Sequence, residues 1–483
     1  MLSKGQRTNN LLDRVYNSVS TSHKLNLYTT GGGTPAIGVL TGVPGASNCI
    51  VEARLPYATT VTDRVIKPFL GDTNGYCNKE VGLALTEAAY SDTISTYLEE
   101  TKNLDSLTTC NFIGIGTTSA IMSKTIKKGD HRMHAFYKKT NNELSPECVQ
   151  YDFILSKGKR SREDEDKVIA DVILNKILAD ATDLESEVPE SEYLFEEEQI
   201  IKTVHTLDNP IDEVLEGKKK FALFIPSNNS TSNNKFTVFT DIKITDSIIF
   251  PGSFNPLTIG HVQLIIESIN HLGFSSEDHP PIILEIGLNA DKGGLTKVQI
   301  EERINQISDQ LKIHVLKNIG IAVTSTPLYL QKTEIFQECT YIIGADTAIR
   351  LLDPKYTKDC ISELIYSLSL IQSRGTKFIV GGRICKGSKT EDGVLSETFL
   401  TLKDIFKICP AKLPDKCKEM FDEILDFRVD LSSTIIREAQ TIVTKLIATN
   451  PDIAREIQST LDEKSIESIK KLKLLIDLAN KLN

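Results

Sequence analysis

The sequence predicts an α/β protein of two domains, an N-terminal α/β domain and a C-terminal doubly wound parallel sheet with a helical tail. A chain of 483 residues is too long for one hydrophobic core. From residue 246 onward, short apolar runs alternate with helical stretches, an order typical of parallel strands joined by crossover helices. Between residues 184 and 245 the composition becomes acidic and then rich in Ser and Asn, which predicts a connector.

Residues 1–183 carry both helical and strand patterns. Glu80–Leu98 and Asp166–Ala179 place apolar residues at helical spacing. Asn111–Gly116 predicts a buried strand that runs into a glycine turn, and Cys148–Leu155 predicts a second strand. These four segments predict one α/β unit.

Two apolar runs interrupt the polar composition of residues 184–245. Lys220–Pro226 and Lys235–Thr240 resemble the two strands of a hairpin, with a Ser/Asn/Thr-rich tip between them. The acidic stretch Asp183–Ile200 indicates a solvated surface segment, because like charges repel one another and favour water. We therefore expect a connector with some structure of its own.

Residues 246–483 contain five short apolar runs, each followed by turn residues. The predicted strands are Ile248–Phe250, Ile282–Ile286, Ile313–Val315, Thr340–Ile343 and Lys377–Val380. A helical pattern follows over residues 434–482. Open parallel sheets bind ligands at the carboxyl ends of their strands, so the loops after these runs are the expected place for a site.

Composition excludes several classes of function. The formal net charge of −10 argues against binding to duplex nucleic acid, which normally needs a basic face. No apolar run approaches the ~20 residues that span a bilayer, and the first ten residues lack a secretory core. Nine cysteines show no zinc spacing, and His131 and His134 lie three apart in a predicted strand, where side chains face opposite ways. We expect a cytoplasmic protein without nucleic-acid or membrane partners and without a protein-bound metal; a homo-oligomer remains open.

The clearest candidate site is the loop between the first C-terminal strand and the helix after it, with the sequence IIFPGSFNPLTIGH over Ile248–His261. Gly252 lets the backbone approach a phosphate, whose oxygens accept hydrogen bonds from loop N–H groups. Gly260 and His261 open the following helix, where the helix dipole favours an anion. His261 is then placed to donate to an α-phosphate as charge builds in the transition state.

A second candidate segment is rich in hydroxyl groups and lies about 170 residues downstream. Ser432, Ser433 and Thr434 precede an apolar helical stretch, and Arg437 lies one turn inside it. Taken alone, a simple N-cap and a grip on the β- and γ-phosphates explain this pattern equally well.

As a pair, the two segments resemble the nucleotidyltransferase superfamily whose signature is His/Thr-x-Gly-His and whose later element is Ser-Ser-Thr-x-Ile-Arg. On this resemblance Thr258 takes the first signature position and His261 the second, both at the catalytic centre. Ser253 and Phe254 belong to the phosphate loop with Gly252. The resemblance implies that the downstream element binds the triphosphate of ATP.

The residues between the two segments are similar to those of nicotinamide/nicotinate mononucleotide adenylyltransferases. Gly344 and Asp346 match that family's Gly-x-Asp strand end, and Arg383, after the last core strand, is an implied triphosphate contact. Asn289 and Lys292 fall where the family places its substrate loop; for Lys292, a solvated loop lysine is an equal alternative. The Phe-Asn-Pro and Ser-Ser-Thr forms favour this family over pantetheine-phosphate adenylyltransferases, whereas the Thr-x-Gly-His form favours the latter.

One departure concerns the acceptor. Members of the family often stack the pyridine ring on a tryptophan, and this chain has none. Tyr329, Phe336 or Tyr356 would have to supply the aromatic face. The implied reaction is attack by the acceptor phosphate on the α-phosphorus of ATP, with Mg²⁺ neutralising charge on the phosphates.

The N-terminal domain carries a different resemblance. Thr41–Ser47 (TGVPGAS), with Thr29–Thr34 (TTGGGT) upstream, is similar to the C-terminal domain of the competence/damage-inducible (CinA) family, whose active members deamidate nicotinamide mononucleotide. On that alignment the nucleophilic serine falls on Thr30, the family tyrosine is Tyr57, and the family lysine is replaced by Thr62.

Without that lysine no activating base is evident near Thr30, so we expect a degenerate domain. Its glycines remain able to cradle a phosphate. Both resemblances involve pyridine mononucleotides, which favours a nicotinamide or nicotinate acceptor for the C-terminal domain. The alternatives are adenylyl transfer to another phosphate, such as phosphopantetheine or a phospho-alcohol, and a nucleotide-binding scaffold with little catalysis.

Overall fold

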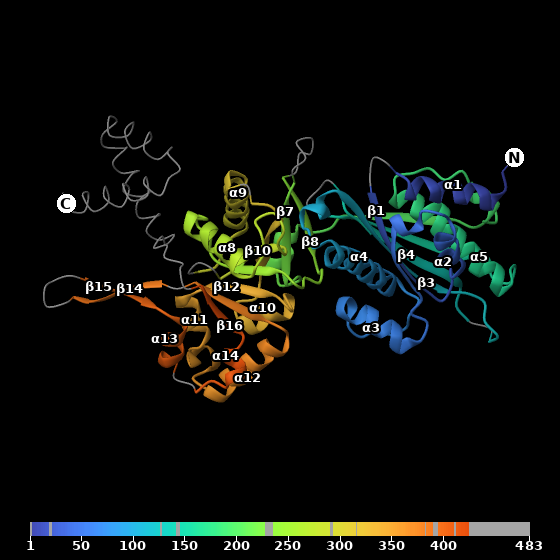
Figure 1. Ribbon diagram of the computed structural model, residues 1–483. Coiled ribbons are helices and arrows are strands. Elements are labelled where there is room, and N and C mark those ends of the chain that lie inside the picture. Colours follow the sequence, from blue (N-terminus) through green and yellow to red (C-terminus); the bar gives the residue numbers. More distant parts are fainter. Residues whose placement is uncertain are drawn as a thin grey trace.

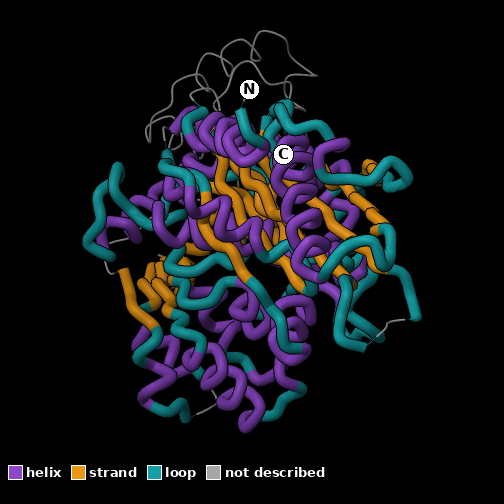
Figure 2. The backbone as a smooth tube through the Cα atoms, turned by 90° about the vertical axis from the view of Figure 1, so that its right-hand side faces the viewer, coloured by secondary structure: helices purple, strands orange, loops and turns teal. Residues whose placement is uncertain are grey.

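The computed structural model describes residues 2–424 except 19–21, 126–127, 142–144, 228–234, 290–292, 315, 382, 390–394 and 410–411, with backbone alone for 313–314 and 383–399. It contains two large β-sheets that lie side by side, each with helices packed on it (Figure 1). Figure 2, turned by 90°, shows the strands enclosed between layers of helices. The predicted two-domain α/β fold is confirmed.

The first sheet has the strand order β2-β1-β3-β4-β5-β6, parallel from β2 to β3 and antiparallel beyond it. Helices α1, α2 and α5 pack on one face, and α3 and α4 on the other. The elements are α1 (Lys4–Tyr16), β1 (Ser22–Thr30), α2 (Pro35–Gly42), β2 (Ile50–Arg54), α3 (Thr59–Leu70), α4 (Lys79–Thr101), β3 (Cys110–Ala120), β4 (His131–Lys139), β5 (Glu147–Leu155), α5 (Arg162–Val172), α6 (Ala179–Ala181) and β6 (Ile200–His205).

One expectation for this domain was wrong in detail. The glycine turn after Asn111–Gly116 does not exist, because β3 continues to Ala120. A Cβ at Gly114 would lie 2.3 Å from the backbone nitrogen of Tyr90, so the glycines admit α4 closely against the strand. The helical stretch expected over Asp166–Ala179 is present, and its turn Ile173–Leu178 is π-helical.

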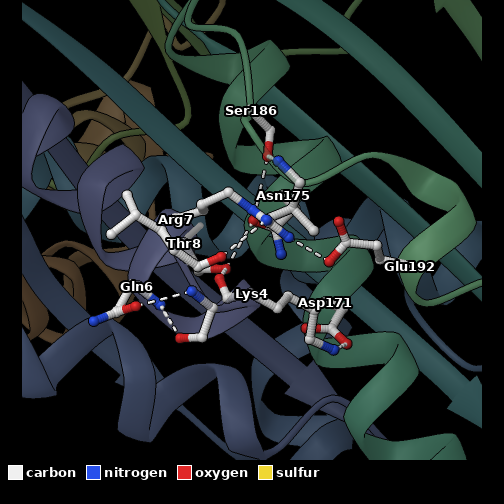
Figure 3. A network of polar contacts seen from close by, with 11 residues as sticks. Lys4, Gln6, Arg7, Thr8, Asp171, Asn175, Ser186 and Glu192 are labelled. Atoms are coloured by element: carbon white, nitrogen blue, oxygen red, sulfur yellow. Dashed lines mark hydrogen bonds and ion pairs between the residues drawn. The ribbon is translucent and has the colours of Figure 1, made fainter.

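Polar contacts tie the N-terminal helix α1 to this irregular region (Figure 3). The ammonium of Lys4 lies 2.6 Å from the carboxylate of Asp171, and the hydroxyl of Thr8 donates to the side-chain oxygen of Asn175 over 3.0 Å. Arg7 pairs with Glu192 in the segment that leads to β6. Helix α1 therefore belongs structurally to the first sheet and fixes the acidic segment beside it.

The second sheet has the order β16-β13-β12-β9-β10-β11-β7-β8; β7 runs antiparallel to β11, and β8 runs antiparallel to β7. Its strands are β7 (Phe221–Pro226), β8 (Phe236–Thr240), β9 (Ile248–Pro251), β10 (Ile282–Gly287), β11 (Ile319–Thr324), β12 (Thr340–Gly344), β13 (Lys377–Gly381) and β16 (Phe421–Ile424). Strands β14 (Arg383–Lys389) and β15 (Leu395–Leu400) form a separate hairpin that projects from the body (Figure 1). The predicted doubly wound parallel core is present from β9 to β13.

Helices cover both faces of the second sheet. They are α7 (Pro210–Leu215), α8 (Ile259–His271), α9 (Lys297–His314), α10 (Tyr329–Ile335), α11 (Ala345–Leu351), α12 (Ile361–Ser373), α13 (Leu402–Ile408) and α14 (Asp415–Lys418). The expected strand at Ile313–Val315 was wrong, because α9 extends to His314 and the strand follows at Ile319–Thr324. The predicted helical tail at residues 434–482 lies outside the described residues.

The expected connector contributes strands to both sheets. Its first part ends in β6, which pairs with β5, and its second part is the predicted hairpin β7–β8, which pairs with β11. Helix α4 joins the two halves, because Ile94 and Leu98 on it share one core with Phe239 and Ile249 of the second sheet. The two sheets are thus packed on a common helix. Among the described residues, no helix is both long and apolar enough to cross a membrane.

Candidate functional site

The candidate site lies where the strand order of the second sheet reverses. Strands β10 and β11 follow β9 on one side, whereas β12 and β13 lie on the other, and ligands of such sheets bind at this switch point. Pairing between β9 and β12 ends at Ile249 and Tyr341, although both strands continue. The loop after β9 and the start of α11 after β12 therefore flank the same crevice at the carboxyl edge.

The loop after β9 is built around a buried phenylalanine. Phe254 is fully buried and adopts a left-handed φ of 44°, a conformation that costs energy for a bulky residue. A Cβ at Gly252 would lie 2.7 Å from its ring, so only glycine fits above it. The Gly252 N–H donates to the carbonyl of Glu285 on β10 over 2.9 Å, which fixes the loop to the sheet.

Thr258 and His261 form a reciprocal cap at the start of α8. The Thr258 backbone N–H donates to Nδ1 of His261 over 2.9 Å, and the Thr258 hydroxyl lies 2.8 Å from the same nitrogen. The His261 N–H donates back to that hydroxyl over 3.4 Å. Because a backbone N–H can only donate, Nδ1 is the acceptor, and the proton of the neutral imidazole sits on Nε2. Within the described chain Nε2 has no hydrogen-bond partner.

Burial lowers the pKa of His261 to about 4. The ring also packs edge-on against Phe254, with ring centroids 5.3 Å apart. At neutral pH the side chain is therefore an uncharged donor through Nε2, which matches its predicted contact with an α-phosphate oxygen.

A pH profile follows from this state. Above about pH 5 His261 stays neutral, so it contributes no change in turnover between pH 6 and pH 8. Turnover should fall only below about pH 6, where an acceptor phosphate gains its second proton. The pKa of this imidazole is about 6.5 in the unfolded chain and about 4 in the folded protein. As the pH falls from 6.5 to 4, protons therefore bind preferentially to the unfolded state, and the free energy of unfolding decreases. A steady loss of turnover from pH 6 to pH 8, measured by pyrophosphate release, would contradict a neutral His261.

The structure describes some of the other residues that are predicted to contact the nucleotide or the acceptor. Gly344 ends β12, and a Cβ there would meet no atom of the described chain within 4 Å, so this strand end is open. Asp346 lies in the first turn of α11, and Asn289 is exposed after β10. Three predictions fall outside the described positions: Lys292, the side chain of Arg383, and the segment Ser432–Arg437 with Ser433 and Thr434. They remain predictions.

A cavity of about 380 Å³ lies between α10, α11 and α12. Two of the three aromatic candidates, Tyr329 and Tyr356, line it. Phe336 does not, because it is fully buried in the core beside Phe221. The Tyr329 ring is held edge-on by Tyr341 and Phe378 at 5.7 Å each, and burial raises the pKa of its hydroxyl.

The cavity also contains residues that sequence reasoning missed. Thr347 and Arg350 on α11 and Lys358 beyond it line the wall opposite α10. Arg350 lies one helical turn after Asp346. This spacing from a predicted site residue is the sequence signal that could have identified it. Two cations in a cavity that also contains Glu363 and several apolar side chains suit a ligand with a planar apolar part and an anionic part.

No group of three metal-ligating side chains gathers anywhere in the described part of the chain. His131 bonds Glu165 on α5 over 2.7 Å, whereas His134 bonds Asp152 on the neighbouring strand over 2.6 Å. The two histidines thus have different partners on opposite faces of the sheet, as their spacing in a strand predicts.

The N-terminal candidate site brings two of the expected family positions, Thr30 and Thr62, close together. The hydroxyls of Thr30 and Thr62 both donate to the carbonyl of Pro56, over 3.0 and 2.7 Å. Both threonines are buried, whereas Tyr57 is 63% exposed and accepts from Arg162 over 3.2 Å. The two family positions therefore meet in space, and each hydroxyl is engaged with a backbone carbonyl.

The glycine loop beside Thr30 holds a carboxylate of the protein itself. Asp166 on α5 accepts the N–H of Gly33 over 2.6 Å, and the N–H and hydroxyl of Thr34 over 3.1 and 2.7 Å. The expectation that this loop can cradle a phosphate was therefore wrong for the N–H groups of Gly33 and Thr34, because Asp166 already accepts both.

No family model matches this chain. The phosphopantetheine adenylyltransferase of Oenococcus oeni is 30% identical to it over 129 residues, which make up 26% of this chain and 69% of that protein.

Similar solved structures are the competence/damage inducible protein CihA from Agrobacterium tumefaciens and a competence-damaged protein (CinA) superfamily protein from Enterobacter cloacae. The first has 12% identity and a TM-score of 0.27, and the match covers 37% of this chain and 98% of that one. The second has 7% identity and a TM-score of 0.25, over 38% and 94%. Likeness at these scores carries no inference about function.

Proposed function

We propose an adenylyltransferase activity for this chain, which belongs to the family of the Oenococcus oeni phosphopantetheine adenylyltransferase by 30% identity across 69% of that protein. In this proposal the second sheet transfers the adenylyl group of ATP to an acceptor phosphate and releases pyrophosphate. The observation that carries it is His261, whose Nε2–H donor is oriented by Thr258 at the switch point of the sheet.

The chemistry requires positioning and charge neutralisation. An oxygen of the acceptor phosphate forms a bond to the α-phosphorus, and the bond to the oxygen bridging the α- and β-phosphates breaks, with its electron pair leaving on pyrophosphate. The acceptor is already ionised, so no general base is needed. His261 donates to the α-phosphate oxygen as negative charge grows there. Mg²⁺ enters bound to the phosphates of ATP and offsets their charge.

The acceptor in this proposal is nicotinamide or nicotinate mononucleotide. The cavity beside α11 supports it, because Tyr329 and Tyr356 offer aromatic faces and Arg350 and Lys358 offer charge. Tyr356 is 47% exposed and free of the packing that holds Tyr329, so it is the residue best placed to stack on an incoming ring.

Phosphopantetheine is the second candidate acceptor, because the Oenococcus relative is a phosphopantetheine adenylyltransferase. Its flexible arm needs apolar contact and no aromatic stacking. Tyr356→Leu separates the two acceptors, because it keeps apolar contact and removes the ring. With a pyridine mononucleotide, KM for the acceptor should rise about tenfold; with phosphopantetheine it should stay near the wild-type value.

The test is a panel of acceptors with ATP and Mg²⁺, followed by pyrophosphate release. Turnover with nicotinamide or nicotinate mononucleotide supports the leading proposal, and turnover with phosphopantetheine alone replaces it by the second. A folded protein that turns over no acceptor contradicts both and favours a nucleotide-binding scaffold.

For the N-terminal domain we expect no deamidase activity. Thr30→Ala should leave pyrophosphate release unchanged and lower the free energy of unfolding by about 1 kcal/mol, the value of one buried hydrogen bond. Ammonia release from nicotinamide mononucleotide, measured by a coupled assay, should stay at background in the wild type. Ammonia release that disappears in Thr30→Ala would show instead that Thr30 is a working nucleophile.

A further inference from the structure

A buried ion pair lies at the carboxyl edge of the second sheet, one strand away from the phosphate loop. Glu285 on β10 pairs with Lys332 on α10, and the hydroxyl of Thr324 on β11 donates to the same carboxylate oxygen. Glu285 is 1% exposed and Lys332 is 6% exposed. The backbone carbonyl of Glu285 also accepts the N–H of Gly252, so the pair and the phosphate loop are fixed to each other.

Stability alone does not account for this pair. Removing two charges from water costs free energy, and the attraction between them often does no more than offset that cost. Apolar side chains at these positions would therefore stabilise a core at least as well. The neighbouring positions Ile283 and Ile286 are apolar and fully buried. This charged pair lies at the end of the sheet where ligands bind.

Gly287 leaves space beside the buried ammonium of Lys332. A Cβ at Gly287 would lie 3.6 Å from Nζ of Lys332 and 3.8 Å from the carboxylate of Glu285, with no other described atom within 4 Å. Its φ lies outside the left-handed region, so the backbone does not require a glycine here. The missing side chain instead leaves space beside the ion pair at the end of β10.

A buried hydroxyl just beyond β11 lacks a hydrogen-bond partner among the described residues. The hydroxyl of Thr326, two residues beyond Thr324, is buried and has no hydrogen-bond partner in the described part of the chain. A buried hydroxyl without a partner is costly. Together with the ammonium, it points to a ligand that offers acceptor oxygens.

We propose that Lys332 binds the phosphate of the acceptor, and that Glu285 and Thr324 are positioning residues that hold the ammonium in place. This inference rests on the proposed adenylyl transfer and adds a residue to its acceptor side. An ammonium has three N–H donors, and with one directed at Glu285 two remain for phosphate oxygens. Such charge-assisted bonds would hold the attacking oxygen at the carboxyl edge, beside the loop that carries the α-phosphate.

The test uses the full chain with Mg²⁺ and saturating α,β-methylene-ATP, so that the triphosphate site is filled. Inorganic phosphate is titrated and its binding is followed by ³¹P NMR. In Lys332→Gln/Glu285→Gln the side chains keep an amide hydrogen bond and lose both charges, and phosphate affinity should fall about 10- to 100-fold. The matched control is Lys138→Gln/Glu87→Gln, a buried pair in the first domain at 2.7 Å, which should bind phosphate as the wild type does.

A second variant leaves the ion pair intact. Gly287→Val should cover the ammonium, raise KM for the acceptor about tenfold, and leave KM for ATP and the unfolding midpoint unchanged. A folded double variant with wild-type phosphate affinity, or a wild type that binds no phosphate, overturns the inference. The proposed function can fail separately from this inference. In that case the wild type binds phosphate but shows no turnover with any acceptor.

Discussion

Replacing His261 with alanine is expected to lower turnover about 100- to 1000-fold, the usual effect of removing a donor that stabilises developing charge. The imidazole is oriented by two contacts from Thr258, and burial keeps it neutral at the pH of the assay. The substitution removes the Nε2–H donor without touching the sheet. The free energy of unfolding should fall by only about 1–2 kcal/mol, because the two cap contacts to Nδ1 are lost. Single-turnover pyrophosphate release measures the first effect and urea denaturation the second.

The matched control is His271→Ala at the other end of the same helix. His271 lies 2.8 Å from the carboxylate of Asp422 and is far along α8 from the phosphate loop. Turnover of this variant should stay at the wild-type level. An unchanged rate in a folded His261→Ala protein would remove His261 from the site.

Replacing Phe254 with alanine is expected to be the most destabilising single change in the site, at about 3–5 kcal/mol. The side chain is fully buried, and Phe250 and His261 both contact its ring, each with centroids 5.3 Å away. The left-handed backbone at this position is held by that burial, so the loop should lose its shape when the ring is removed. Turnover should fall together with the free energy of unfolding.

Phe239→Ala provides the comparison for this variant. Phe239 is 1% exposed and packs in the core shared with α4, away from the phosphate loop. It should cost a similar free energy of unfolding and leave turnover per folded molecule unchanged. If Phe254→Ala retained wild-type turnover under conditions where it is folded, the ring would not be shaping the phosphate loop.

Much of the second sheet could be predicted because its strands are continuous apolar runs. Apart from Thr340 and Lys377 at the first positions of their strands, the residues of Ile248–Phe250, Ile282–Ile286, Thr340–Ile343 and Lys377–Val380 are buried, which is the pattern of a parallel sheet between helices. The start of α8 was also predictable, since a threonine and a histidine three residues apart flank its first turn.

Other features depend on contacts that one sequence does not reveal. The glycines of β3 resemble a turn, and only their packing against α4 shows why a strand needs them. Asp166 fills the N-terminal glycine loop from 132 residues away in the chain. The pair of Glu285 and Lys332 did leave a signal, because a glutamate within an apolar strand is rarely buried without a partner.

The central claim is adenylyl transfer, and movement of the α-phosphate tests it most directly. The full chain is incubated with Mg²⁺, nicotinamide mononucleotide and ATP labelled with ³²P at the α-position, and the products are separated. We expect the label to appear in a dinucleotide with equimolar release of pyrophosphate, and this transfer to be nearly lost in His261→Ala. Label that stays in ATP, or appears only as AMP, with every acceptor of the panel in a folded wild-type protein would contradict the assignment.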